Sequence, residues 1–183
     1  MRADARKNYD LLIEVARDVF VEQGAEASLR DIARRAGVGM GTLYRHFPNR
    51  DSLLEALLRS RFAALTARAE SLLLAADPAA ALLEWLAESV AFTHQHRGII
   101  APLMSAIDDP ESALHSACVA LRAAGTSLLT RAQQAGQARP DLSGDGTVFD
   151  LIAALAWLRE QPSHAPRAER ILAVLADAIL TAA

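Results

Sequence analysis

The spacing of apolar residues predicts helices along most of the chain. In residues 3–23, apolar side chains recur at intervals of three and four, which places them on one face of a helix: Leu12, Ile13, Ala16, Val19 and Phe20. With glycine and proline as breaks, the same pattern predicts helices over 29–36, 39–47, 49–75, 79–98, 99–107, 109–138, 147–160 and 167–181. We therefore expect an all-α fold of about nine helices.

The start of the second predicted helix carries a capping signal. Ser28 precedes the apolar stripe of "LRDIARRA", and Asp31 follows three residues later. This arrangement resembles a capping box with aspartate in place of glutamate, so we expect the Ser28 side chain to cap the helix.

Composition changes the picture little. Of the 183 residues, 52% are hydrophobic, and the single cysteine, Cys118, excludes an intrachain disulfide. The charged start "MRADARKNYD" does not resemble a secretory signal, and uncharged runs such as "GIIAPLMSAI" are too short to span a bilayer. We expect a soluble, cytoplasmic protein without membrane contact.

The distribution of charge is more informative than its total. The formal net charge is −3, which alone argues against nucleic acid as a partner. Between Arg30 and Arg50, however, five arginines stand against one acidic residue, Asp31. This local basic surface surrounds the string "GVGMGTLYRHF" at residues 37–47.

That string predicts the second half of a helix-turn-helix. Gly37 falls in the turn, and Ala33 falls where the two helices cross closely. Small residues at Gly39 and Gly41 would let the backbone approach duplex DNA, while Leu43 and Phe47 face inward. The alternative for Tyr44 is a half-buried aromatic residue, and the alternative for His46 is an ordinary surface histidine. Arg34 and Arg35 are expected to be solvated charges that attract the DNA backbone generally.

Residues 28–57, "SLRDIARRAGVGMGTLYRHFPNRDSLLEAL", closely resemble the DNA-binding signature "DIA..AGVS.GTLY.HF..K..L" of the TetR/AcrR family of transcriptional regulators. The resemblance implies a helix-turn-helix domain over residues 1–48 and a helical effector-binding and dimerisation domain over 49–183. It implies phosphate contacts from Tyr44, His46 and Arg50, and base-edge contacts from Thr42 and Arg45. The full set implied to contact DNA is Ser28, Gly39, Met40, Gly41, Thr42, Tyr44, Arg45, His46 and Arg50.

Two positions depart from the family pattern. Gly39 stands where serine or threonine is frequent, and Met40 stands where lysine is frequent. Both changes remove hydrogen-bonding groups. We therefore expect Thr42, Tyr44 and Arg45 to carry more of the DNA recognition than in other members.

The resemblance also implies an effector cavity and a dimer. Ordinary core is the alternative for each of the residues assigned to the cavity: Trp85, Phe92, His96, Met104 and Cys118. The last two predicted helices carry broad apolar faces that exceed what one chain of this length needs, so pairing with a second copy is expected to bury them. The predicted interface consists of Val148, Leu151, Ile152, Leu155, Ile171, Leu172, Leu175 and Ile179.

The resulting hypothesis is a one-component regulator: a homodimeric repressor that a small apolar effector releases from a palindromic operator. The alternatives are an architectural DNA-binding protein without an effector, or a small helical enzyme. No catalytic motif supports an enzyme. No cofactor is expected, and no metal, because His115 and Cys118 lack a second ligand pair. The operator, the effector, the target genes and the choice between repression and activation stay open.

Overall fold

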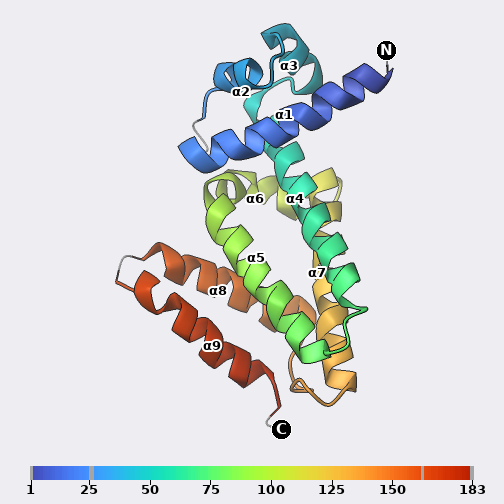
Figure 1. The fold of residues 1–183 in the computed structure, drawn as a ribbon, viewed down its shortest axis with the longest axis vertical. Helices are drawn as coiled ribbons and strands as arrows, with labels where there is room; N and C mark the ends of the chain where they lie inside the picture. The colour runs from blue at the N-terminus through green and yellow to red at the C-terminus, as the bar shows by residue number, and fades with distance from the viewer. Residues whose placement is uncertain (1, 25–26, 162, 182–183) are drawn as a thin grey trace. The chain divides into compact units, whose positions relative to one another are not determined.

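The computed structural model describes residues 2–24, 27–161 and 163–181 (Figure 1). Within these residues the fold is all-α, as predicted, and a single isolated bridge between Ala138 and Leu180 is the only β-type pairing. The α-helices are α1 (Arg2–Gln23), α2 (Leu29–Arg35), α3 (Met40–His46), α4 (Arg50–Leu72), α5 (Pro78–Ile100), α6 (Met104–Asp108), α7 (Ala113–Gln134), α8 (Phe149–Glu160) and α9 (Ala168–Ile179). Three shorter turns are η1 (Ala101–Leu103), η2 (Gly144–Val148) and η3 (Ala165–Arg167).

Two predicted helices differ from the observed ones. The helix expected over 99–107 is absent as such, because α5 continues to Ile100 and a 3-10 turn containing Pro102 separates it from α6. The helix expected to begin at Asp109 begins at Ala113 instead. The reason is local: the Asp109 carboxylate accepts a hydrogen bond from the Glu111 N–H at 3.0 Å, which forms a turn. The Ser112 hydroxyl then accepts from the Leu114 N–H at 3.0 Å, as an N-cap does.

The chain divides into two compact units. The first comprises Met1–Arg61 and His96–His115, and the second comprises Phe62–Gln95 and Ser116–Ala183. The first part of α4 thus packs with the first unit, beyond the boundary expected at residue 48. The functional division into 1–48 and 49–183 stays a prediction.

The first unit has a core to which four helices contribute. Large side chains that are at most 1% exposed come from α1 to α4: Leu12, Ile32, Leu43, Phe47 just after α3, and Leu53, Leu57 and Leu58 of α4. The apolar stripe predicted for residues 3–23 is confirmed, because all five of its residues are buried. Burial of one face of α3 against this core leaves its opposite face to solvent.

The second unit is built around Trp85 on α5. Its ring is fully buried, and its Nε1–H donates to the Leu65 carbonyl oxygen of α4 at 3.0 Å. On α7, a β-carbon added at Gly125 would lie only 2.4 Å from the Trp85 ring. Gly125 is therefore required by close packing, since its position leaves no space for a side chain.

The C-terminal end of α9 is hydrogen-bonded to the loop that follows α7. The Arg139 N–H donates to the Ile179 carbonyl oxygen, and the Thr181 N–H donates to the Gln137 carbonyl oxygen. These bonds tie the segment after α9 to the connection between α7 and η2. No helix in the described part of the chain combines the length and apolar character needed to cross a membrane.

Candidate nucleic-acid interface

The turn between α2 and α3 has the geometry that the helix-turn-helix prediction requires. Gly37 adopts φ +66°, a left-handed conformation that favours glycine. The next residue is hydrogen-bonded back to α2, since the Val38 N–H donates to the Ala33 carbonyl oxygen at 3.0 Å. Ala33 is buried, at 2% exposure, and the close crossing of the two helices there stays a prediction.

The start of α3 contains glycines that the chain itself does not require. Gly39 has an ordinary extended conformation, φ −72° and ψ 152°. A β-carbon added at Gly39 or at Gly41 would meet no atom within 4 Å. Among the described residues, neither backbone strain nor internal packing therefore explains these two glycines.

The two faces of α3 differ as predicted. Leu43 and Phe47 are buried, at 0% and 1% exposure. On the other side Tyr44 is 48% exposed, and Arg45 and Gly41 are exposed as well. Met40, Thr42 and His46 are half-buried.

Tyr9 of α1 supports the end of α3, a role that the sequence analysis missed. Its ring centroid lies 5.1 Å from that of Phe47 and 6.0 Å from that of His46. Its hydroxyl oxygen lies 3.3 Å from the Arg59 Nη2 donor of α4. The sequence pattern could have indicated this role, because Tyr9 lies three residues before Leu12 and therefore on the same face of α1.

Arg50, at the start of α4, has a structural partner. Its Nη2 donates to the Ala27 carbonyl oxygen at 2.7 Å. This bond connects the first turn of α4 to the segment that leads into α2. The phosphate contact expected from Arg50 stays a prediction.

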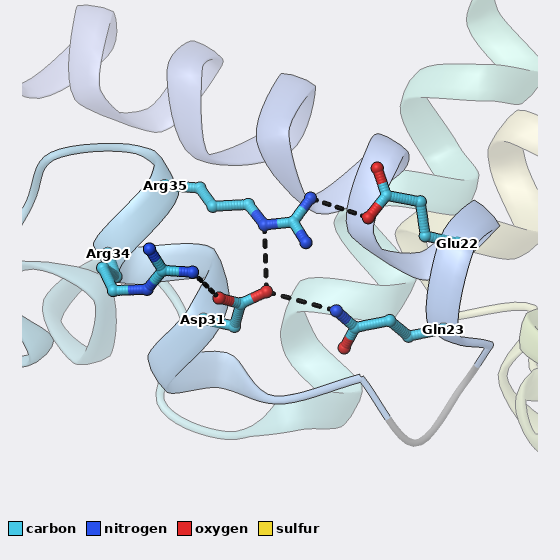
Figure 2. Close-up of polar contacts among 5 residues, drawn as sticks. All are labelled: Glu22, Gln23, Asp31, Arg34 and Arg35. Carbon is cyan, nitrogen blue, oxygen red and sulfur yellow. Dashed lines mark hydrogen bonds and ion pairs between the residues drawn. The ribbon is translucent and has the colours of Figure 1, made fainter.

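The capping box expected at α2 is wrong. Ser28 occupies the N-cap position with extended backbone angles, but its side chain makes no capping hydrogen bond. Asp31 is engaged elsewhere, as Figure 2 shows: its carboxylate accepts from Arg34 Nη2 at 2.5 Å, Arg35 Nε at 2.9 Å and Gln23 Nε2 at 3.2 Å. An aspartate is also too short to replace glutamate readily in this motif.

The same contacts correct the expectation that Arg34 and Arg35 are simply solvated. Arg35 Nη1 also donates to Glu22 at 2.7 Å, so the group links the end of α1 to α2 (Figure 2). The Arg34 hydrogen bond lowers the pKa of Asp31, and the Glu22 hydrogen bond raises the pKa of Arg35. Two of the five local arginines are therefore neutralised by neighbouring carboxylates. Arg30 and Arg45 are exposed and form no ion pair with any residue that the structure describes.

The residues expected to line an effector cavity are scattered. Trp85 and Phe92 are buried in the second unit, and Cys118 is half-buried there. His96 is buried in the first unit, whereas Met104 of the same unit is 45% exposed. Whether these five residues line a cavity stays a prediction.

An apolar hollow of about 260 Å³ lies elsewhere in the second unit, lined by residues of α5, α8 and α9. We call it the α5–α8–α9 hollow. From α5 and α8 it is lined by Leu83, Leu86, Val90, Leu151, Ile152 and Leu155. From α9 it is lined by Glu169, Leu172, Ala173, Leu175, Ala176 and Ile179. None of the five cavity residues named from the sequence belongs to this lining.

The faces of α8 and α9 expected to pair with a second copy point largely inward. Four of the eight residues are at most 5% exposed within the single chain: Val148, Ile152, Leu155 and Ile179. Within the single chain these four are covered, because α8 and α9 pack together and their apolar sides converge with α5 on the hollow. The interface with a second copy stays a prediction. Leu151, Ile171, Leu172 and Leu175 are half-buried. The large apolar side chains left exposed on these helices are Trp157, at 56%, and Val174, at 61%.

His115, which was considered together with Cys118 for a metal site, contacts the backbone. His115 Nδ1 lies 2.7 Å from the Ile107 carbonyl oxygen, so one ring nitrogen is engaged by the backbone. Among the described residues, no three side chains of histidine, cysteine, aspartate or glutamate form a group that could hold a metal ion.

Comparison with known proteins gives two family matches. Residues 12–57 match the model "Bacterial regulatory proteins, tetR family", and residues 77–179 match "Transcriptional regulator SbtR-like, C-terminal domain". The first match covers the second half of α1, all of α2 and α3, and the start of α4. The second covers α5 to α9.

Solved structures resemble the chain over nearly its whole length. A TetR transcriptional regulator from Streptomyces coelicolor is 32% identical, with a TM-score of 0.77, over 96% of this chain and 99% of that one. A TetR transcription regulatory protein from Mycobacterium vanbaalenii is 33% identical, with a TM-score of 0.74, over 98% of this chain and 99% of that one. An HTH-type transcriptional regulator of Staphylococcus aureus is 46% identical over 54 residues, which span only 29% of either protein.

Proposed function

Because the chain belongs to the TetR family of DNA-binding transcriptional regulators, with an SbtR-like C-terminal domain, we propose that it is a homodimeric repressor. It binds a palindromic operator through α3, and a small apolar effector releases it. TetR-family regulators are transcription factors and not enzymes. The proposed place of action is the cytoplasm, where a bacterial regulator meets its DNA.

The observation that carries the DNA-binding part is the surface of α3. Gly39 and Gly41 have no internal packing reason to be glycine, while Tyr44 and Arg45 beside them face solvent. A duplex approaching this side would meet backbone at the glycines and hydrogen-bonding groups next to them. We assign base-edge contacts to Thr42 and Arg45, and phosphate contacts to Tyr44 and His46.

The remaining members of the predicted DNA-contacting set have supporting positions. Ser28 precedes α2 with its hydroxyl free of a capping bond, which leaves it available to a phosphate oxygen. Met40 and Gly39 line the approach of the backbone. Arg50 contributes a phosphate contact only if its guanidinium can serve both the Ala27 carbonyl oxygen and the DNA. Five donors in one guanidinium make this dual role feasible.

Trp157 and Val174 support the dimer. Both side chains are more than half exposed, one on α8 and one on α9. Large exposed apolar side chains on helices that pack together are typical of an interface. Two-fold symmetry would repeat α3 about one helical turn apart on DNA, roughly 34–36 Å.

The effector part is supported by the α5–α8–α9 hollow, whose lining is almost entirely apolar. An effector that binds one conformation better than another shifts the equilibrium by its difference in affinity, which is usually about 1–3 kcal/mol. α4 is the proposed lever, because its residues 50–61 belong to the first unit and residues 62–72 to the second.

The experiment begins with selection of bound fragments from random DNA, which should yield a palindrome. Binding to that operator is then measured for the wild type, Tyr44→Ala and Gly41→Leu. Both substitutions change exposed positions, so the fold should persist while affinity falls at least about ten-fold, the equivalent of 1.4 kcal/mol. Wild-type affinity in both variants would remove α3 from the interface. Specific binding that no small molecule reverses would favour the architectural alternative.

A further inference from the structure

The α5–α8–α9 hollow combines an apolar lining with one acidic group. Of its twelve lining residues, Glu169 alone is ionisable. It lies in the first turn of α9. No cation among the described residues forms an ion pair with Glu169. The carboxylate is therefore a negative charge without a partner at the edge of an apolar space.

The apolar part of the lining comes from three helices of the second unit. Leucine and isoleucine side chains of α8, such as Ile152 and Leu155, face leucines of α5 and α9. At about 260 Å³, the space lies just below the ~300–1,000 Å³ typical of small-molecule pockets, so it suits a small molecule and not a large ring system.

We propose that the α5–α8–α9 hollow binds a small hydrophobic amine. The alkyl part occupies the space between the helices, and the ammonium group lies beside Glu169. An alkyl carboxylate would bring a second negative charge to Glu169, and an alcohol would leave Glu169 without a counter-ion. Charge complementarity thus selects the cation among molecules of equal apolar size.

This inference rests on the proposed function in one respect only, namely that the bound amine is the effector that releases the protein from DNA. Binding of an amine to the hollow is a separate event from release of DNA, and the two are measured separately.

The first experiment measures binding of three eight-carbon probes to the full-length protein without DNA, by calorimetry. The probes are octylamine, octanol and octanoate at pH 7. We expect octylamine to bind tightest and octanoate weakest. We also expect affinity for alkylamines to rise about four-fold for each added methylene until the hollow is full, because each methylene is removed from water. Equal affinities for the amine and the carboxylate would overturn the proposal.

The second experiment places the amine. Glu169→Gln removes the charge and keeps the shape. Since Glu169 is exposed, octylamine affinity should fall by about two- to five-fold while octanol affinity stays unchanged. Asp177→Asn is the matched control, because Asp177 is an exposed carboxylate of α9 outside the hollow. Loss of octylamine affinity in Asp177→Asn, or none in Glu169→Gln, would overturn the assignment.

A third variant, Ala176→Phe, fills the hollow. It should abolish binding of octylamine and octanol alike while circular dichroism shows an intact helical fold. If Ala176→Phe instead changes the mass of the particle in solution and leaves octylamine binding intact, a second copy covers the hollow and the proposal fails. If octylamine binds as expected but does not release the operator, the amine site stands and its role as effector is wrong.

Discussion

Glycines show at the residue scale how one residue type serves different ends. At Gly37 the backbone needs a positive φ, at Gly125 the Trp85 ring leaves no room for a β-carbon, and at Gly41 nothing in the chain opposes a side chain. The sequence alone does not separate these cases, because glycine looks the same in all of them. The three sites therefore predict different responses to the same substitution.

Gly125→Ala and Gly41→Ala should change stability in opposite directions. The first forces a β-carbon to within 2.4 Å of the Trp85 ring, and such overpacking costs about 1–3 kcal/mol. The second adds a methyl group in open space within a helix, which stabilises by up to about 1 kcal/mol. Thermal unfolding should show a lower Tm for Gly125→Ala and an equal or higher one for Gly41→Ala. An equal rise in the Tm of Gly125→Ala and of Gly41→Ala would contradict the packing argument, because it would mean that the Trp85 ring moves aside without cost.

Short polar contacts connect the helices at the element scale. Asp31 receives hydrogen bonds from both α1 and α2, and through Arg35 the group also reaches Glu22 (Figure 2). Local sequence rules pointed Asp31 towards a capping role, whereas one of its observed partners is Gln23 of α1, which precedes it by eight residues. Packing of α1 against α2 decides which role the carboxylate takes.

Asp31 predicts a pH dependence of stability. Its pKa is lowered in the folded protein by Arg34, so the unfolded chain binds a proton at higher pH than the folded one. The stabilisation is therefore present above the unfolded value of about 3.9 and is lost as the pH falls through the lower folded value. The Tm difference between wild type and Asp31→Asn should be largest near pH 7 and shrink below about pH 4.

The control for this measurement is Asp10→Asn, a change on an exposed stretch of α1. Its effect on Tm should be smaller at pH 7. A Tm difference for Asp31→Asn that stays constant from pH 7 to pH 3 would contradict the role assigned to the carboxylate.

Exposed apolar side chains point to assembly at the scale of the whole molecule. Trp157 of α8 and Val174 of α9 are more than half exposed, whereas Ile152, Leu155 and Ile179 of the same two helices are buried. Leu74 is even more exposed, at 88%, but it lies just beyond α4 and far along the chain from both. Adjacent position on paired helices, and not exposure alone, distinguishes an interface from an isolated apolar residue.

Trp157→Glu should prevent dimerisation. A buried tryptophan at an interface commonly contributes about 2 kcal/mol or more, and a charge in its place adds a desolvation cost. Light scattering coupled to gel filtration should show a monomer, and operator affinity should fall because two linked half-sites no longer act together. Leu74→Glu is the control and should leave the mass unchanged. A dimer in Trp157→Glu would place the interface elsewhere.

The sequence by itself determined the helical class, the turn at Gly37 and the inward positions of Leu43 and Phe47. These follow from periodicity and backbone preference, which act between neighbours in the chain. The tertiary structure alone decided the partners of Asp31 and Arg50, the support from Tyr9, and the direction in which α8 and α9 turn their apolar faces. Those depend on which distant residues meet, and an amphipathic pattern states that a face will be buried without stating against what.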